Sequence, residues 1–268
     1  MNTYLQTIDD FCAWLDVYVE RYYSSDEELN AMVQYKHEHS VRTRCEMRCL
    51  ALQLGWSTGR VQLAEIVGLL HDVGRFEQIQ KHQTYNDHRS VDHGQLGAEI
   101  LMQKDLLRAF SSNEQQWMLN AIRYHNARYL PRTLTGDTLR MAQLIRDADK
   151  LDIFRSCSSA YERYRKDPQA FAREIGYPMD PYCTPEVIAA TLRGESVEYC
   201  KLRTVYDCMV MQLGWIFDLN FPMSVAALHT RGHVDEMIRL LPDWPQLQAV
   251  CDAVTTYMNE QVDLASLL

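Results

Sequence analysis

Apolar residues recur at the spacing of an α-helix along most of this chain, whereas no stretch alternates well enough to require a β-strand. The pattern therefore predicts an all-α fold. In residues 4–23, one helical face would carry Leu5, Ile8, Cys12, Leu15, Val19 and Tyr22. Helices are expected at about residues 4–23, 37–54, 60–72, 93–109, 114–126, 137–153, 155–165, 185–193, 196–219, 223–241 and 245–264.

Turn-forming residues mark where some of these helices begin and end. Ser57, Asp92 and Asn113 are the expected N-cap residues of three helices. Gly74 follows an apolar helix and is expected to end it as a C-cap. Residues 74–92 would then form a polar loop, and a loop of that length is more often functional than merely connecting.

The length of 268 residues is near the size at which a single core begins to divide into two. We expect residues 1–155 to form a helical bundle that includes the N-terminal helix. Residues 156–268 would form a helical extension that packs on this bundle, so that the two parts make one compact unit. Three prolines within residues 166–184, at positions 168, 178 and 181, are expected to separate the bundle from the C-terminal helices.

Composition disfavours several classes of protein. The formal net charge of −9 disfavours broad, non-specific binding to nucleic acid. Nowhere do 18 apolar residues run together, so no membrane span is expected. Eight cysteines without a CxxC pair favour reduced thiols in the core over a disulfide framework. We therefore expect a cytoplasmic protein without membrane or stable nucleic-acid partners, and a homodimer is left open.

Six side chains that can ligate a metal lie in five short segments of the chain. They are His39, the adjacent pair His71 and Asp72, His93, His125 and Asp149. Because each segment is expected to be helical, these side chains could converge inside a bundle. Imidazole and carboxylate together favour first-row divalent metals. Six ligands exceed the need of one open hydrolytic site, so two metal ions bridged by Asp72 are expected.

The stretch LIRDADKLDIF offers three carboxylates, and helical phase distinguishes them. Asp149 shares a face with apolar residues such as Ile145 and Ala148, whereas Asp147 shares the polar face. A carboxylate on an apolar face is costly unless it is paired or bound to a metal. We therefore expect Asp149 to be the ligand, Asp152 to be a capping or supporting group, and Asp147 to face water.

The motifs of the chain resemble those of the HD superfamily of metal-dependent phosphohydrolases over roughly residues 30–155. They are HSVR at 39–42, LHDVGRFE at 70–77, SVDHGQLGAEIL at 90–101, AIRYHN at 121–126 and IRDADKLD at 145–152. The resemblance implies that His39, His71, Asp72 and Asp149 bind a first metal, and members with two metals add histidines that match His93 and His125. HNARYLP replaces the HHE and GYP motifs of related cyclic-dinucleotide phosphodiesterases, which argues against that activity.

The resemblance implies hydrolysis of a phosphate ester or anhydride, with a nucleotide or small phosphodiester as substrate. The cofactors would be two divalent ions of Mn, Fe, Co, Ni, Zn or Mg, and Asp72 and Arg75 would be catalytic. The expected substrate-binding residues are Arg75, Lys81, His82, His88, Arg128 and Lys150. Two alternatives remain: an oxygenase with two irons, as in members that resemble inositol oxygenase, and a non-catalytic metal-binding sensor.

Overall fold

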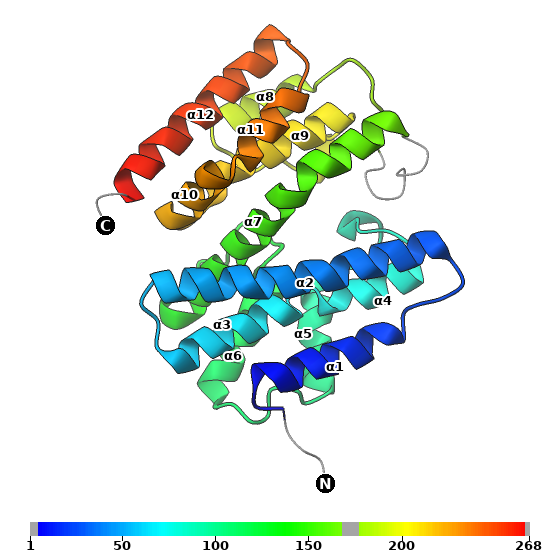
Figure 1. The fold of residues 1–268 in the computed structure, drawn as a ribbon, viewed down its shortest axis with the longest axis vertical. Coiled ribbons are helices and arrows are strands. Elements are labelled where there is room, and N and C mark those ends of the chain that lie inside the picture. Colours follow the sequence, from blue (N-terminus) through cyan, green and yellow to red (C-terminus); the bar gives the residue numbers. More distant parts are fainter. Residues whose placement is uncertain (1–4, 168–176, 266–268) are drawn as a thin grey trace. The chain divides into compact units, whose positions relative to one another are not determined.

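The structure, a computed structural model, describes residues 5–167 and 177–265. These residues form helices and connecting turns without a strand, which confirms the all-α fold (Figure 1). The α-helices are α1 (Ile8–Glu20), α2 (Glu27–Gln53), α3 (Thr58–Leu70), α4 (Val73–His82), α5 (His93–Gln103), α6 (Ser112–Tyr124), α7 (Gly136–Lys166), α8 (Pro185–Leu192), α9 (Val205–Gly214), α10 (Pro222–Arg231), α11 (His233–Leu240) and α12 (Pro245–Ala265). The 3-10 helices are η1 (Asp87–Arg89), η2 (Tyr199–Lys201) and η3 (Trp215–Asp218).

The chain divides into two compact units between Asp152 and Ile153, close to the boundary expected after residue 155. The division falls within α7, which runs from Gly136 to Lys166. The two helices expected at 137–153 and 155–165 therefore form one continuous helix. The expected separation within residues 166–184 is therefore not where the units divide. Pro168 itself lies outside the described residues.

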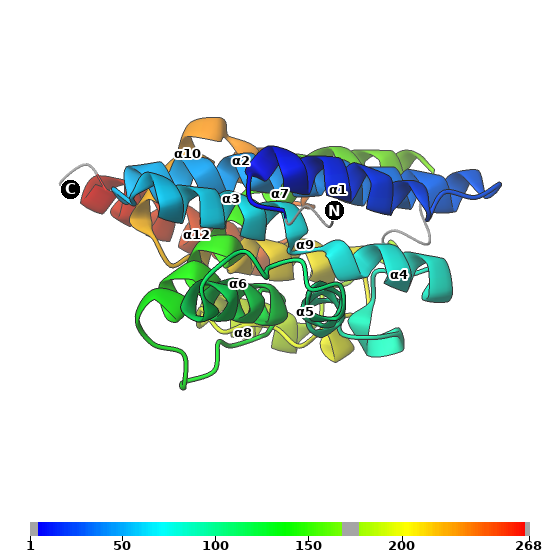
Figure 2. The ribbon, with the colours of Figure 1, turned by 90° about the horizontal axis from the view of Figure 1, so that it is seen from below.

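The first unit has two layers of helices around one apolar core. Figure 2 shows α1, α2 and α3 on one side of this unit and α4, α5 and α6 on the other. Within the layers α2 packs on α3 and α5 packs on both α4 and α6, while α2–α4 and α3–α6 contacts join the layers. Phe11, Met47, Leu70, Phe76 and Met118 are fully buried in this core. The chain passes from the first layer to the second at His71 and Asp72, between α3 and α4.

The loop expected at residues 74–92 is wrong over 74–82, because α4 runs from Val73 to His82. Val73, Phe76 and Ile79 are buried at helical spacing, and the polar residues between them obscured this pattern. Gly74 is therefore not a C-cap. A Cβ at Gly74 would lie 2.3 Å from the backbone oxygen of His93, so glycine allows α4 to approach α5 closely.

Two of the three expected helix N-caps are correct. Ser57 precedes α3, and Asp92 precedes α5 and accepts hydrogen bonds from the backbone N–H groups of Gly94 and Gln95. Asn113 is wrong as an N-cap. Ser111 is the N-cap of α6 instead, and it forms a reciprocal capping box with Glu114.

The second unit is built from the C-terminal part of α7 and from α8 to α12. In it α8 packs on α9, and α10 packs on α12. The fully buried residues include Val187, Leu213, Leu228 and Val254. The helix expected over 223–241 is broken at Gly232, which has φ +71° and ends α10 in the left-handed conformation.

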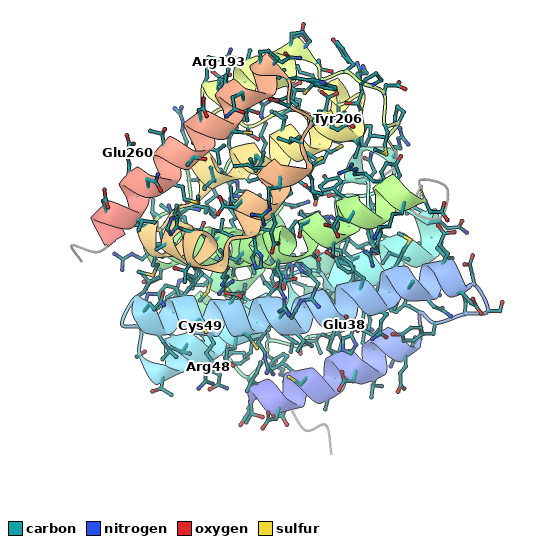
Figure 3. All side chains as sticks on the ribbon, turned by 45° about the horizontal axis from the view of Figure 1, so that its top comes forward. Glu38, Arg48, Cys49, Arg193, Tyr206 and Glu260 are labelled. Atoms are coloured by element: carbon teal, nitrogen blue, oxygen red, sulfur yellow. The ribbon has the colours of Figure 1, made fainter. Side chains whose placement is uncertain are left out.

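All eight cysteines are free thiols, but not all of them belong to the core. Cys45, Cys49 and Cys200 are exposed, contrary to the expectation of core thiols. Figure 3 labels Cys49 on α2, near the exposed Arg48. Apolar residues next to Cys49 in the sequence suggested a buried thiol, but the buried positions in this part of α2 are Met47, Leu50 and Ala51.

Candidate metal centre

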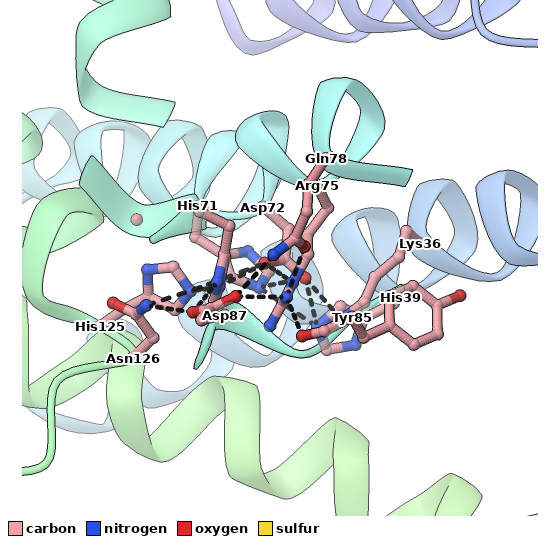
Figure 4. Close-up of polar contacts among 12 residues, drawn as sticks. Lys36, His39, His71, Asp72, Arg75, Gln78, Tyr85, Asp87, His125 and Asn126 are labelled. Atoms are coloured by element: carbon pink, nitrogen blue, oxygen red, sulfur yellow. Dashed lines mark hydrogen bonds and ion pairs between the residues drawn. The ribbon is translucent and has the colours of Figure 1, made fainter. Parts of the chain in front are cut away.

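The six expected metal ligands come together in the first unit, where the ends of several helices meet. Figure 4 labels four of them, His39, His71, Asp72 and His125. Four of the six occupy positions at or next to a helix end. His71 is the C-cap of α3, Asp72 is the N-cap of α4, His93 is the first residue of α5, and His125 is the C-cap of α6. A side chain at a helix end can reach a shared point without crossing the helix beside it. His39 and Asp149 approach from within α2 and α7.

The two carboxylate oxygens of Asp72 face different pairs of histidines. Its Oδ2 atom lies 3.5 Å from Nε2 of His39 and 3.5 Å from Nε2 of His71. Its Oδ1 atom lies 3.2 Å from Nε2 of His93 and 3.6 Å from Nε2 of His125. Asp72 therefore lies between two pairs of histidine nitrogens.

Asp149 joins one of these pairs. Its Oδ1 atom lies 3.0 Å from Nε2 of His39 and 3.6 Å from Nε2 of His71. We call His39, His71 and Asp149, with Oδ2 of Asp72, the first ligand group. His93 and His125, with Oδ1 of Asp72, form the second ligand group. The first group thus has one more carboxylate than the second.

The helix ends hold two of the histidine rings in place. Nδ1 of His71 lies 2.8 Å from the carbonyl oxygen of Gly68, and Nδ1 of His125 lies 2.7 Å from that of Ile122. Carbonyl groups in the last turn of a helix lack intrahelical donors, so they accept the Nδ1–H hydrogen bonds. With Nδ1 protonated, the neutral ring has its acceptor at Nε2, which points into the centre.

Carboxylates outside the ligand groups hold the other two rings. Nδ1 of His39 lies 2.7 Å from Oδ2 of Asp152, which Arg42 also contacts through a hydrogen bond of 3.0 Å. Nδ1 of His93 lies 2.6 Å from Oδ2 of Asp87. Asp152 thus supports His39 from outside the ligand group, in the role that helical phase suggested.

Asp87 is the centre of a network that sequence reasoning missed. Its Oδ1 atom accepts hydrogen bonds from Arg75 at 2.9 Å and Gln78 at 2.8 Å, and its Oδ2 atom accepts one from Asn126 at 2.9 Å. Although burial raises the pKa of Asp87, the hydrogen bond with His93 and the charge of Arg75 hold it well below its usual value. Only its position in the polar segment marked for function pointed to Asp87.

The expectation that Asp147 faces water is wrong. Asp147 is fully buried, whereas the side chain of Asp149 is 17% exposed. Between residues 141 and 152 of α7, every residue except Gln143 and Asp149 is buried. The phase argument assumes that one face of the helix is exposed to water. This segment has no exposed face, so the argument does not apply to it.

Arg75 lies beside the centre, with one edge of its guanidinium group anchored. Its Nη1 atom donates to Gln78 Oε1 at 2.7 Å, to the carbonyl oxygen of Tyr85 at 2.6 Å and to Asp87. Its buried Nε atom has no hydrogen-bond partner among the described residues and lies 3.6 Å from Oδ1 of Asp72. The Nε edge therefore faces the carboxylate that both ligand groups share.

The other expected substrate-binding residues do not form one cluster with Arg75. Lys81 and His82 are exposed at the end of α4, roughly 13 Å along that helix from Asp72. Lys81 pairs there with Glu77. His88 is exposed on η1, and Arg128 is exposed with its guanidinium group over the ring of Tyr129. Lys150 is buried on α7.

Lys36 is a cation of the centre that sequence reasoning missed. It is buried on α2, one turn before His39, and its Nζ atom lies 2.7 Å from Oδ2 of Asp72. The rings of Tyr35 and Tyr85 flank it, with centroids 5.8 Å and 5.5 Å from Nζ. Its spacing from His39 was the available sequence signal.

Opposite charges within the centre shift the pKa values of its groups. Burial alone would lower the pKa of His71, but the Asp72 and Asp149 carboxylates raise it to about 10. Burial would raise the pKa of Asp72, but Lys36 and His71 hold it well below its usual value. Burial lowers the pKa of His125 to about 4, and the neighbouring His93 and His71 add to this effect. His71 and His125 therefore differ in protonation at neutral pH when no metal is bound.

These donors suit divalent metals, because all four Nε2 atoms point inward and all four Nδ1 atoms are hydrogen-bonded elsewhere. Residues 37–153 match the family model of the HD domain, a range that contains all six side chains. This segment of the chain is therefore an HD domain, which indicates metal-dependent activity of the hydrolase type. No curated protein and no solved structure matches the chain. None of the helices described here is long and apolar enough to cross a membrane.

Proposed function

We propose that this protein is a metal-dependent phosphohydrolase that cleaves a phosphate ester or anhydride. The observation that carries the proposal is the geometry of Asp72, whose two oxygens face two separate ligand groups. Such an arrangement suits two metal ions that share one carboxylate. We further propose a nucleotide or small phosphodiester as the substrate, and His39, His71, Asp72, His93, His125 and Asp149 as the metal ligands.

Divalent ions held by these ligands would polarise the phosphoryl group and lower the pKa of an attacking water molecule. The residues of the chain perform the remaining tasks. The backbone carbonyls of Gly68 and Ile122 keep two imidazole rings aimed inward. Asp152 and Asp87 do the same for His39 and His93. Fixed ligand orientation reduces the reorganisation that the site must undergo during the reaction.

We propose that Arg75 stabilises negative charge on the phosphoryl group. Asp87, Gln78 and Tyr85 anchor its Nη1 atom, so the guanidinium plane is already oriented. Its Nε edge, which faces Asp72, has no hydrogen-bond partner among the described residues. A planar group with a donor that makes no hydrogen bond within the protein suits the oxygens of a phosphoryl group.

Oxygen-free turnover is the test of the proposed function. The protein would be loaded with Mn²⁺, Co²⁺, Ni²⁺, Zn²⁺ or Mg²⁺ under nitrogen and offered nucleotides, phosphodiesters and generic phosphate esters. Release of phosphate or of a nucleotide product is expected from the parent protein and not from Asp72→Ala. Turnover that requires oxygen and two irons would establish an oxygenase instead. A metal-loaded protein that turns over no member of the panel would favour the sensor alternative.

A further inference from the structure

Lys36 lies closer to Asp72 than Arg75 does, at 2.7 Å against 3.6 Å. Arg42 pairs with Asp152, and Arg75 has its shorter ion pair, of 2.9 Å, with Asp87. Lys36 pairs with Asp72, which belongs to both groups. Metal ions bound to Asp72 would compete with Lys36 for its negative charge.

The remaining donors of Lys36 have no polar acceptor in the parts of the chain that the structure describes. An ammonium group carries three N–H donors, and one of them suffices for Oδ2 of Asp72. The other close contacts of Nζ are the faces of Tyr35 and Tyr85. A buried cation with one shared carboxylate and two aromatic faces retains donors for an anion.

The aromatic neighbours also fix where this ammonium lies. The hydroxyl group of Tyr85 donates to the carbonyl oxygen of Met32 at 3.0 Å, which holds its ring against Lys36. The ring of Tyr35 stacks on that of His39, with centroids 6.2 Å apart and planes 8° apart. Lys36 is therefore held at the edge of the first ligand group, on the same helix as His39.

We propose that Lys36 is a substrate-binding residue that contacts the phosphoryl group of the substrate. This inference rests on the proposed function. Two divalent ions at the centre would outweigh the negative charges of Asp72 and Asp149. With Lys36 included, the excess would be about three positive charges. A dianionic phosphate monoester or terminal phosphate offsets such an excess better than a monoanionic phosphodiester does. The substrate class that Lys36 favours is therefore a phosphate monoester or a terminal phosphoryl group.

Binding of inorganic phosphate to the Mn²⁺-loaded protein tests this role without any need for turnover. Lys36→Met removes the charge and keeps the length of the side chain, and metal content is measured in the same samples. We expect Lys36→Met to keep its metal and to bind phosphate about 10- to 100-fold more weakly, as for the loss of one charge-assisted hydrogen bond. Lys36→Arg should recover part of the affinity, because it restores a positive donor.

Lys104→Met is the matched control, because Lys104 also lies over a tyrosine ring, 5.7 Å from the centroid of Tyr18, but is exposed. It should bind phosphate as the parent does. Unchanged phosphate affinity in Lys36→Met would overturn the proposal. Loss of metal from that variant would also overturn it, because Lys36 would then act by holding Asp72.

A measurement on the parent protein covers the case in which the Lys36 variants do not fold. Acetylation of lysines is followed by mass spectrometry with and without phosphate in the Mn²⁺-loaded protein. Slower acetylation of Lys36 but not of Lys104 would support the contact, and equal rates would overturn it. Lys36-dependent phosphate binding without any turnover would contradict the proposed function alone, whereas turnover with Lys36-independent phosphate binding would contradict this inference alone.

Discussion

Nδ1 of His93 lies 2.6 Å from Oδ2 of Asp87, and this contact joins the segment between α4 and α5 to the second ligand group. Through its other oxygen, Asp87 also holds Arg75 at 2.9 Å. One carboxylate thus orients both a proposed metal ligand and the proposed phosphate-binding cation. Asp87 belongs to neither ligand group, and its contacts with His93 and Arg75 make it a positioning residue in this proposal.

Asp87→Asn is expected to weaken metal binding at the second ligand group about 10- to 100-fold, as for other supporting partners of metal-bound histidines. The amide keeps the size of the side chain but loses the charge that favours His93 and Arg75. Calorimetric titration of metal into the metal-free protein measures the effect. Asp105→Asn is the control, because Asp105 is an exposed residue with φ 52°, a conformation that asparagine adopts readily. Unchanged affinity at both sites in Asp87→Asn would contradict the role of the contact.

Asp72→Ala and His93→Ala should differ in how many metal ions they lose. Asp72 offers one oxygen to each ligand group, whereas His93 belongs to the second group alone. We expect about two ions per chain in the parent, about one in His93→Ala, and close to none in Asp72→Ala. Plasma mass spectrometry of dialysed samples gives these ratios, and circular dichroism checks that each variant is folded. A parent protein that holds one ion, even at saturating metal, would rule out a bridging role for Asp72.

Arg75→Ala should keep both metals but lose about 2 to 4 kcal/mol of transition-state stabilisation, the range for removal of a charge donor. Arg75→Lys should restore only part of this stabilisation, because a single ammonium cannot occupy both the anchor at Asp87 and the Nε position beside Asp72. The ratio of kcat/KM between parent and variant gives the energy. Parent-like kcat/KM in Arg75→Ala would show that this Nε position does not serve the reaction.

Metal uptake near pH 8 should release about one proton from His71. In the metal-free protein its pKa is raised to about 10, so the ring is protonated at this pH and must lose a proton to become a ligand. The pKa of His125, about 4, means that this ring is already neutral and releases none. Titrations in two buffers with different ionisation enthalpies give the number of protons released.

The pKa shifts of His71 and His125 also determine how the stability of the metal-free protein changes with pH. The folded pKa of His71 lies above the unfolded value of 6.5, so protonated His71 contributes its full stabilisation below pH 6.5. That contribution is lost as the pH rises through about 10. For His125 the shift is opposite, so the metal-free protein loses stability as the pH falls from 6.5 towards 4. Metal binding that releases no proton at pH 8 would show that His71 is neutral before binding.

The fold class and the six converging side chains followed from the sequence because both depend on local signals. Helical periodicity is visible in a short window, and each motif carries its own histidine or aspartate. His71 shows why helix ends matter, because the apolar run of α3 stops where the ring must reach the centre. Helix boundaries were predicted less well than the helices themselves. Gly74 resembles a residue that ends a helix, but it allows α4 to pack closely on α5.

The residues that sequence reasoning missed act through distant contacts. Asp87 meets Asn126, which is 39 positions away, and Lys36 meets Asp72, which is 36 positions away. No local pattern reveals either pair, because the spacing of Lys36 from His39 and the place of Asp87 in the polar segment do not identify the distant partner. Asp147 was misplaced for a related reason, since the neighbours that cover α7 on every side come from other parts of the chain.

Gly74→Ala should disturb the candidate metal centre from a position that is not part of it. The added Cβ would lie 2.3 Å from the backbone oxygen of His93 and 2.8 Å from the backbone nitrogen of Gly97, and backbone atoms cannot rotate away as a flexible side chain can. The helices α4 and α5 must therefore separate, which displaces His93 relative to Asp72. We expect a loss of about 3 kcal/mol in the free energy of unfolding, at the upper end for overpacking, together with weaker metal binding at the second ligand group.

Gly59→Ala is the matched control for this substitution. Gly59 lies in the first turn of α3, and a Cβ there meets no atom within 4 Å. Alanine is the better helix former, so Gly59→Ala should raise the free energy of unfolding by about 0.5 kcal/mol and leave metal binding unchanged. Urea unfolding of the metal-free proteins gives both free energies. Equal stability of the two variants would mean that α4 and α5 can move apart without cost, and His93 would then owe its position to Asp87 rather than to the close approach of these helices.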